Sequence, residues 1–365
     1  MIATELARLY LPYKNEYVNA FEQFFCSGIY IGGDRVSSFE REVAKFLDAE
    51  DAAGCGNGTH ALQLGLMACG VKPGDEVITV ANTYYATARA IIDVGAIPVF
   101  CDVNRFGLID VGKIQALITP KTKAIVPVHL YGMVADITGL RDVCKKNKLA
   151  LIEDCSHAFG SSFNGRKLGA DAYCACFSLY PTKNLGAMGD AGVVVGAADV
   201  IKKIKLMRYY SPTVAHDSFS LLSLHSRMDP LQACLLNVSL SHIEEWNVKR
   251  IANATYYKNR FDGYVPFFTP LCHEGVVPYV FPVLTKKRED FISYMRKKGI
   301  VVQVHYGVNL HKISHITKQS FNLPMTERLN KEVVSIPVSP MITKDELRYV
   351  ADMVLEYFRH KGTLR

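Results

Sequence analysis

The chain has 365 residues, 49% of them hydrophobic and 21% charged, so it has room for about two domains and a large apolar core. This composition excludes an intrinsically disordered chain. The formal net charge of +7 is scattered, without a basic stripe interleaved with aromatic residues, so no nucleic-acid partner is expected.

The first elements predicted along the chain are two amphipathic helices, over 16–25 and 36–47. In the second helix, Val36, Phe39 and Val43 recur at helical spacing and fall on one face. We expect this face to pack against the body of the protein.

A glycine-rich segment follows, Gly54-Cys-Gly56-Asn-Gly58-Thr59-His-Ala61. Glycines let the backbone approach an anion, and a helix opening at Thr59 would point free N–H groups at it, which predicts phosphate binding. The run Gly56-x-Gly58-x-x-Ala61 also matches the dinucleotide fingerprint. That fingerprint needs a strong strand directly before it, and residues 49–53 are a poor one.

From residue 75 the pattern alternates between strands and helices, which predicts a largely parallel sheet covered on both faces. Strands are expected over 76–80, 97–101, 124–130 and 149–153, and helices over 85–93, 111–118 and 137–146. Ligands of such sheets bind outside the carboxyl ends of the strands. Thr83, Tyr84, Asp154 and Ser178 all lie at such ends, so we expect them to meet.

Beyond residue 200 the pattern becomes a shorter α+β series. Helices are predicted over 200–210, 231–246, 249–261, 288–298 and 345–358, and strands over 279–284 and 301–305. We therefore predict a large α/β domain over 1–244 and a smaller C-terminal α+β domain over 245–365.

The cysteines and the apolar runs indicate the cellular compartment in which the protein is expected. None of the ten cysteines forms a CxxC pair, and Cys101, Cys174 and Cys176 sit inside apolar runs, where cysteine behaves as a small hydrophobic residue. The first residues do not resemble a signal peptide, and no apolar run approaches the roughly 18 residues of a membrane span. We expect a cytoplasmic protein with no membrane partner.

One lysine stands out because of its setting. An apolar run leads to Ser178, then Lys183 enters a glycine-containing loop, and a valine-rich strand follows at 193–195. A lysine held out of water has a lowered pKa, and its neutral amine can form a Schiff base. A phosphate loop, an aromatic residue at a strand end, a buried acid and such a lysine are the parts that pyridoxal phosphate chemistry needs.

Five motifs resemble the DegT/DnrJ/EryC1/StrS aminotransferases, which act on nucleotide-linked keto-sugars. They are Gly56-Asn-Gly58-Thr59, Asn82-Thr-Tyr84, Glu153-Asp154-Cys-Ser-His157-Ala, Phe177-Ser178-x-x-x-x-Lys183-Asn-Leu-Gly and Gly189-Asp190-x-Gly192. The resemblance covers about residues 27–311. It implies the type I (aspartate aminotransferase-like) fold, pyridoxal 5'-phosphate bound to Lys183 and passing through pyridoxamine phosphate, and a homodimer with active sites at the subunit interface.

The resemblance also implies roles at the cofactor. Lys183 matches the Schiff-base lysine that also moves protons, and Asp154 matches the partner of the pyridine nitrogen. Gly58, Thr59 and Ser178 match phosphate contacts, and Tyr84 matches the stacking aromatic, although Tyr85 could take that role. His157 stands where most relatives have glutamine near the ring hydroxyl. His225 stands where relatives have an asparagine that reaches the neighbouring subunit's cofactor phosphate.

For the substrate, His305-Tyr306-Gly-x-x-x-His311 resembles a family segment that lines the sugar site. Together with Tyr180, these residues are the predicted substrate-binding set. The resemblance is nearest to enzymes that aminate C3 of a dTDP-3-keto-6-deoxyhexose with glutamate as donor, giving an amino sugar for surface glycans or natural products.

Alternatives remain open at this point. The enzyme could aminate C4, the glycine run could belong to a nicotinamide-dependent oxidoreductase, or the fold could serve a non-catalytic regulator. His311 and His315 have a spacing that could ligate zinc, but no third ligand with suitable spacing follows, so no metal is expected. His129 is expected to be a core residue, and Cys155 is discounted as a nucleophile.

Overall fold

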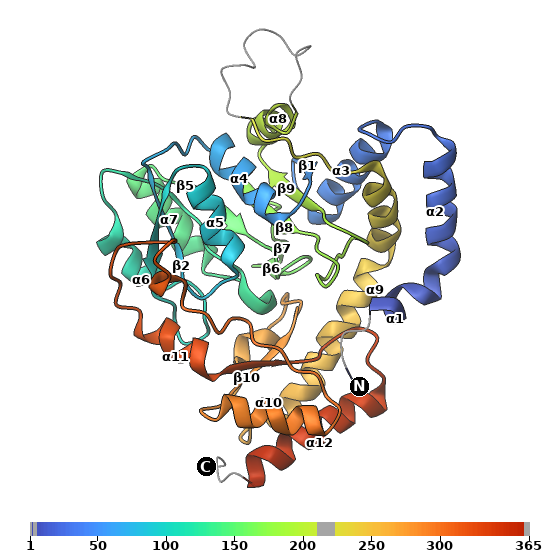
Figure 1. Ribbon diagram of the computed structural model, residues 1–365, viewed down its shortest axis with the longest axis vertical. Coiled ribbons are helices and arrows are strands. Elements are labelled where there is room, and N and C mark those ends of the chain that lie inside the picture. The colour runs from blue at the N-terminus through green and yellow to red at the C-terminus, as the bar shows by residue number, and fades with distance from the viewer. Residues whose placement is uncertain (1, 3–5, 210–222, 361–365) are drawn as a thin grey trace.

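The computed structural model describes residue 2 and residues 6–209 and 223–360. Its centre is a seven-stranded sheet of order β1-β9-β8-β5-β4-β2-β3 (Figure 1). β9 pairs antiparallel with both neighbours, and the other pairs are parallel. The predicted mixed, mostly parallel sheet is confirmed. Its strands are β1 (Asp51–Cys55), β2 (Glu76–Val80), β3 (Ile97–Cys101), β4 (Thr122–Ile125), β5 (Ala150–Asp154), β8 (Cys174–Ser178) and β9 (Gly192–Gly196).

Helices bury both faces of this sheet. Ala175 and Phe177 of β8 share one core with α3 (Asp34–Leu47) and α9 (Pro230–Phe261). Cys174 and Cys176 of the same strand share another core with α4 (Gly58–Ala68) and α8 (Ala198–Met207). Because both faces are covered, the strand is apolar at nearly every position instead of at every second one.

The remaining elements surround this unit (Figure 1). Around the sheet lie α1 (Leu6–Tyr10), α2 (Lys14–Cys26), α5 (Tyr85–Asp93), α6 (Val111–Ile114), α7 (Ile137–Asn147) and the short pair β6 (Ser162–Phe163) and β7 (Arg166–Lys167). A second, antiparallel pair packs with three helices near the C-terminus: β10 (Phe281–Leu284), β11 (Val333–Ile336), α10 (Arg288–Lys297), α11 (Pro324–Glu332) and α12 (Lys344–His360).

We predicted that residues 49–53 are a poor strand, and this prediction is wrong, because β1 covers residues 51–55. Residues 51–55 pair along their whole length with β9, and Ala52 to Cys55 are buried. Alanine and glycine have little strand preference of their own, so the valine-rich partner and the burial make this strand. A missing strand is therefore no argument against the dinucleotide fingerprint.

Two further predictions in the second half of the chain are wrong. Residues 231–261 form one helix, α9, because no glycine or proline interrupts the stretch where we predicted a break. Residues 301–305 form no strand, and only an isolated bridge joins Gln303 to Ser335. The predicted helix 200–210 is α8, which ends at Met207, and residue 210 lies outside the described residues.

The boundary between residues 244 and 245 falls inside α9. The division into two domains stays a prediction.

Candidate active site

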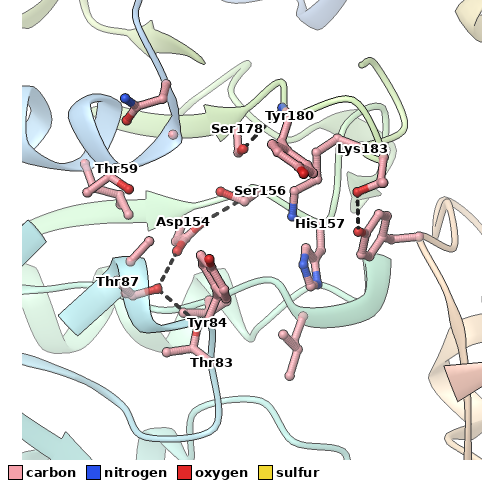
Figure 2. A pocket seen from close by; sticks show the side chains of 18 of the residues that line it. Thr59, Thr83, Tyr84, Thr87, Asp154, Ser156, His157, Ser178, Tyr180 and Lys183 are labelled. Atoms are coloured by element: carbon pink, nitrogen blue, oxygen red, sulfur yellow. Dashed lines mark hydrogen bonds between the residues drawn. The ribbon is translucent and has the colours of Figure 1, made fainter. Parts of the chain in front are cut away.

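A cavity of about 780 Å³ lies at the carboxyl ends of β5 and β8, where the topology places ligands of such a sheet (Figure 2). Its wall combines the start of α4, the loop before α5, the loop after β8 and the segment around residue 305. Most of the predicted site residues line it: Gly58, Thr59, Tyr84, Asp154, His157, Ser178, Tyr180, Lys183, His305 and Tyr306.

The start of α4 forms the anion-binding end of the cavity. Asn57 caps the helix, its side-chain oxygen accepting a hydrogen bond from the N–H of His60 at 2.8 Å. A Cβ on Gly58 would lie 2.5 Å from the Cβ of Ser178, so only glycine lets the helix approach β8 this closely. The free N–H groups of this first turn, with the hydroxyls of Thr59 and Ser178, suit a phosphate.

Asp154 ends β5 and is 4% exposed. Its Oδ2 accepts a hydrogen bond from the hydroxyl of Thr87 at 2.8 Å, and its Oδ1 accepts one from the N–H of Ser156 at 3.1 Å (Figure 2). Thr83 lies 3.0 Å from the Thr87 hydroxyl and must donate to it, since the only proton of Thr87 goes to the carboxylate. These donors are neutral, so a cationic partner in the cavity is the natural complement of this buried acid.

Lys183 is half-buried, and its side chain reaches into the cavity (Figure 2). Burial lowers the pKa of its amine to about 8, and the charge of Asp154 opposes part of this shift. The amine therefore loses its proton more readily than an ordinary lysine does, as Schiff-base chemistry requires.

Tyr279 is a site residue that the sequence analysis missed. The Nζ of Lys183 lies 4.7 Å from the centroid of its ring, and its hydroxyl lies 3.1 Å from that of Thr182. The ring of His157 lies 4.2 Å away, between centroids. Tyr279 comes from a distant part of the chain with no motif around it, so no local signal could have revealed it. Thr87 could have been found, because it lies in the first turn of α5, directly after the predicted site residues Thr83 and Tyr84.

Two histidines of the cavity wall are neutral at ordinary pH. Burial holds the pKa of His157 well below its usual value, and the charge of Lys183 adds to the effect. Burial, again with Lys183, lowers the pKa of His305 to about 4. His305 is fixed by the Ser335 hydroxyl, 3.0 Å from its Nδ1.

The two neighbouring tyrosines at the start of α5, Tyr84 and Tyr85, have different surroundings. Tyr84 lines the cavity, is 62% exposed, and has its ring centroid 5.7 Å from that of Tyr306. Tyr85 packs against a core cluster and lies 6.0 Å from the ring of His315. Tyr84 is therefore the one placed to stack on a ligand in the cavity.

Two predicted site residues do not line this cavity. His225 lies in the segment after the undescribed stretch, with its Nε2 3.0 Å from the guanidinium of Arg227. His311 is buried beside α11, with its Nε2 3.2 Å from the Glu327 carboxylate. Their roles remain predictions.

Among the described residues, one buried cluster has ligand atoms close enough for a metal ion: His129, Glu153 and Cys155. His129 accepts a hydrogen bond from the N–H of Ala135 on Nδ1, and its Nε2 lies 3.0 Å from Glu153, so its ring is fully used by core contacts. Separately, no described helix is long and apolar enough to cross a membrane.

This site belongs to a recognisable class of enzyme centre. An anion-binding helix end, a buried carboxylate whose hydrogen-bond donors are neutral, and a lysine with a lowered pKa suit a phosphorylated pyridine aldehyde that exchanges amino groups.

The comparisons with known proteins give the family. The model of the DegT/DnrJ/EryC1/StrS aminotransferase family matches residues 13–355, and the chain belongs to this family. It is 34% identical over 367 residues to a pleiotropic regulatory protein of Geobacillus stearothermophilus, covering 98% of both chains. It is 35% identical over 360 residues to dTDP-3-amino-3,6-dideoxy-alpha-D-galactopyranose transaminase of Aneurinibacillus thermoaerophilus, covering 97% of this chain and 98% of that one.

Among solved structures, DesV of S. venezuelae superposes with a TM-score of 0.92 at 32% identity, covering 97% of both chains. The type I aminotransferase fold, the enzyme class and pyridoxal phosphate as the cofactor are thereby confirmed. The chain's own residues fit this cofactor. The absence of a side chain at Gly58 lets the start of α4 approach β8 and leaves its N–H groups free for a phosphate, and the buried Asp154 carboxylate can pair with a pyridinium. A nicotinamide-dependent oxidoreductase is excluded.

Proposed function

We propose that this aminotransferase moves an amino group from glutamate to C3 of a dTDP-linked 3-keto-6-deoxyhexose. The observation that carries the proposal is that Lys183 and Asp154 line the same cavity as the candidate sugar-binding residues His305 and Tyr306. The Aneurinibacillus relative, named for a dTDP-3-amino-dideoxyhexose, supports the nucleotide and the position. An intact Lys183 in the cavity favours catalysis over a purely regulatory role.

When bound, pyridoxal phosphate supplies an aldehyde that exchanges amino groups and a ring that accepts electrons. Lys183 would hold this group covalently, and its free amine would carry a proton between carbon atoms. Asp154 would keep the pyridine nitrogen protonated, and Thr87 and Ser156 hold the two carboxylate oxygens of Asp154 in place. Gly58, Thr59 and Ser178 would bind the phosphate, and Tyr84 would pack on the ring.

The substrate side of the proposal uses Tyr180, His305 and Tyr306, which line the cavity, and His311, which is buried outside the cavity lining. The neutral state of His305 suits contact with an uncharged sugar. His157 lies beside Lys183, where the family has its contact to the ring hydroxyl (Figure 2).

We further propose a homodimer in which His225 serves the cavity of the neighbouring subunit. This residue lies outside its own cavity, as such a role requires. On and just after α2, the large apolar side chains Phe21, Phe25 and Ile31 are exposed, which is typical of a surface that a second subunit covers.

The described cysteines form no disulfide, which supports a reducing cytoplasm.

The test is an assay of purified protein with glutamate and either 3-keto or 4-keto dTDP-6-deoxyhexose. We expect 2-oxoglutarate and an amino sugar from the 3-keto substrate. Faster amination of the 4-keto sugar would contradict the C3 assignment, and a preference for the UDP-linked form of the same sugar would contradict the nucleotide.

A further inference from the structure

His157 makes two hydrogen bonds that fix where its proton lies. Its Nδ1 accepts from the backbone N–H of Tyr131 at 3.4 Å, and its Nε2 lies 2.9 Å from the hydroxyl of Tyr306. The ring is buried and, as its lowered pKa shows, neutral. A neutral imidazole has one N–H only, and Nδ1 is used as an acceptor, so the proton must be on Nε2.

It follows that Nε2–H donates to the Tyr306 hydroxyl, which accepts. The phenolic proton of Tyr306 must then go to another acceptor. Among the described residues, no hydrogen bond from this hydroxyl to a second group occurs, and Tyr306 lines the cavity. A hydroxyl donor without a partner is costly when buried, so this arrangement calls for an acceptor on a ligand.

The surroundings indicate which ligand provides that acceptor. Tyr306 is half-buried, and its ring lies beside the exposed Tyr84, on the open side of the cavity. Asp154 and Thr87 are buried deeper. On its other side, the His157 ring packs on Tyr279, whose face carries the amine of Lys183. The hydroxyl therefore lies between the exposed Tyr84 and the Lys183 amine, within reach of a substrate that enters past Tyr84.

We propose that Tyr306 donates a hydrogen bond to an oxygen of the keto-sugar, and that His157 is the positioning residue that holds the hydroxyl in this donor orientation. This inference rests on the proposed function for the identity of the substrate. It gives His157 a role through Tyr306, since its only N–H is already used and cannot also serve the ring hydroxyl of the cofactor.

The first test needs no substrate. In cofactor-free protein labelled with ¹⁵N-histidine, the His157 signal, assigned by its loss in His157→Gln, is expected to show a neutral ring protonated on Nε2 from about pH 6 to pH 9. A ring protonated on Nδ1, or one that becomes charged in this range, would overturn the proposal. This result stands whether or not a keto-sugar is the substrate.

The second test is kinetic and uses the holoenzyme. Tyr306→Phe is expected to raise the KM for the keto-sugar about tenfold, which is the typical effect of one lost hydrogen bond, and to change the KM for glutamate less than twofold. His157→Leu should have a similar effect, and His157→Gln, whose amide N–H can still donate to Tyr306, should recover most of the lost affinity. Tyr264→Phe, an exposed tyrosine outside the cavity, is the matched control.

Two kinetic results would overturn the proposal. One is an equal rise in both KM values, together with a shift in the cofactor's visible absorbance, which would put the Tyr306 hydroxyl on the cofactor. The other is failure of His157→Gln to improve on His157→Leu. If the wild-type protein aminates no keto-sugar at all, the proposed function fails, and the NMR result still decides the state of His157.

Discussion

At the scale of single residues, the proposed chemistry depends on the proton of Lys183. Burial lowers the pKa of its amine to about 8 from 10.5, so the folded protein releases this proton at a lower pH than the unfolded chain does. The neutral amine, which attacks the cofactor aldehyde, becomes available as the pH rises through about 8, more than two units earlier than for an exposed lysine.

We therefore expect cofactor-free protein to capture pyridoxal phosphate faster as the pH rises, with an inflection near pH 8. Stopped-flow absorbance in the visible range measures this rate. Asp154→Asn should move the inflection to lower pH, because the carboxylate charge favours the ammonium form. An inflection above pH 10 in the wild-type protein would show that the lysine is not desolvated.

At the same scale, the sequence revealed the residues that carry a family motif and missed those that meet only in the fold. Lys183, Asp154 and Gly58 stand in short, recognisable runs. Tyr279 and the bond between His157 and Tyr306 join segments far apart in the sequence, and only the packing of β10 and its neighbours against the sheet brings them together.

At the scale of elements, the contact between α4 and β8 shapes the phosphate end of the cavity. Gly58→Ala would place a methyl group 2.5 Å from the Ser178 Cβ and 3.0 Å from its Cα. The backbone of Ser178 in β8 cannot move away from the added methyl group easily, so we expect the free energy of unfolding to fall by about 1–3 kcal/mol. Affinity for pyridoxal phosphate should fall more than affinity for pyridoxal, which lacks the phosphate.

Thermal or urea unfolding and equilibrium cofactor titration measure these effects. Gly112→Ala is the matched control, because a Cβ there meets only the Oδ1 of Asp110, at 3.4 Å. If Gly58→Ala lowered the affinity for pyridoxal phosphate and for pyridoxal equally, the start of α4 would not be the phosphate-binding element.

The elements also show where sequence patterns suffice. The alternation from residue 76 to 154 predicts β2, β3 and β5 well, because these strands are mostly apolar runs. The strand expected over 124–130 is instead β4, over Thr122–Ile125, and it includes the exposed Lys123. The sequence does not reveal β1, because its residues have little strand preference of their own. Pairing with β9 stabilises this strand. The continuity of α9 could not be predicted from periodicity, because parts of the helix face different cores along its length.

At the scale of the whole molecule, the proposed dimer makes a prediction about shared sites. If His225 of one subunit serves the Lys183 site of the other, a mixed dimer of Lys183→Ala and His225→Ala subunits contains one fully intact site. Two preparations that are each nearly inactive should then regain, after unfolding and refolding together, about a quarter of wild-type activity, since half of the dimers are mixed and each has one good site of two.

Aminotransferase assay of the co-refolded mixture checks this expectation. The control is a mixture of Lys183→Ala with Asp154→Ala. Both residues line the cavity of one subunit, so every site in every dimer of this mixture carries one defect, and no activity should return. No recovery from two nearly inactive preparations would place His225 in its own subunit's site. A His225→Ala preparation that is fully active by itself would contradict a role for His225 in either site.

The most direct test of the central claim is chemical labelling of the lysine. Purified protein supplied with pyridoxal phosphate and then reduced with borohydride should carry the pyridoxyl group on Lys183, found by peptide mass spectrometry. Lys183→Ala should carry none, and the surface substitution Lys203→Ala should leave the labelling unchanged. A wild-type protein that stays colourless with the cofactor, or that is labelled elsewhere than at Lys183, would contradict the account.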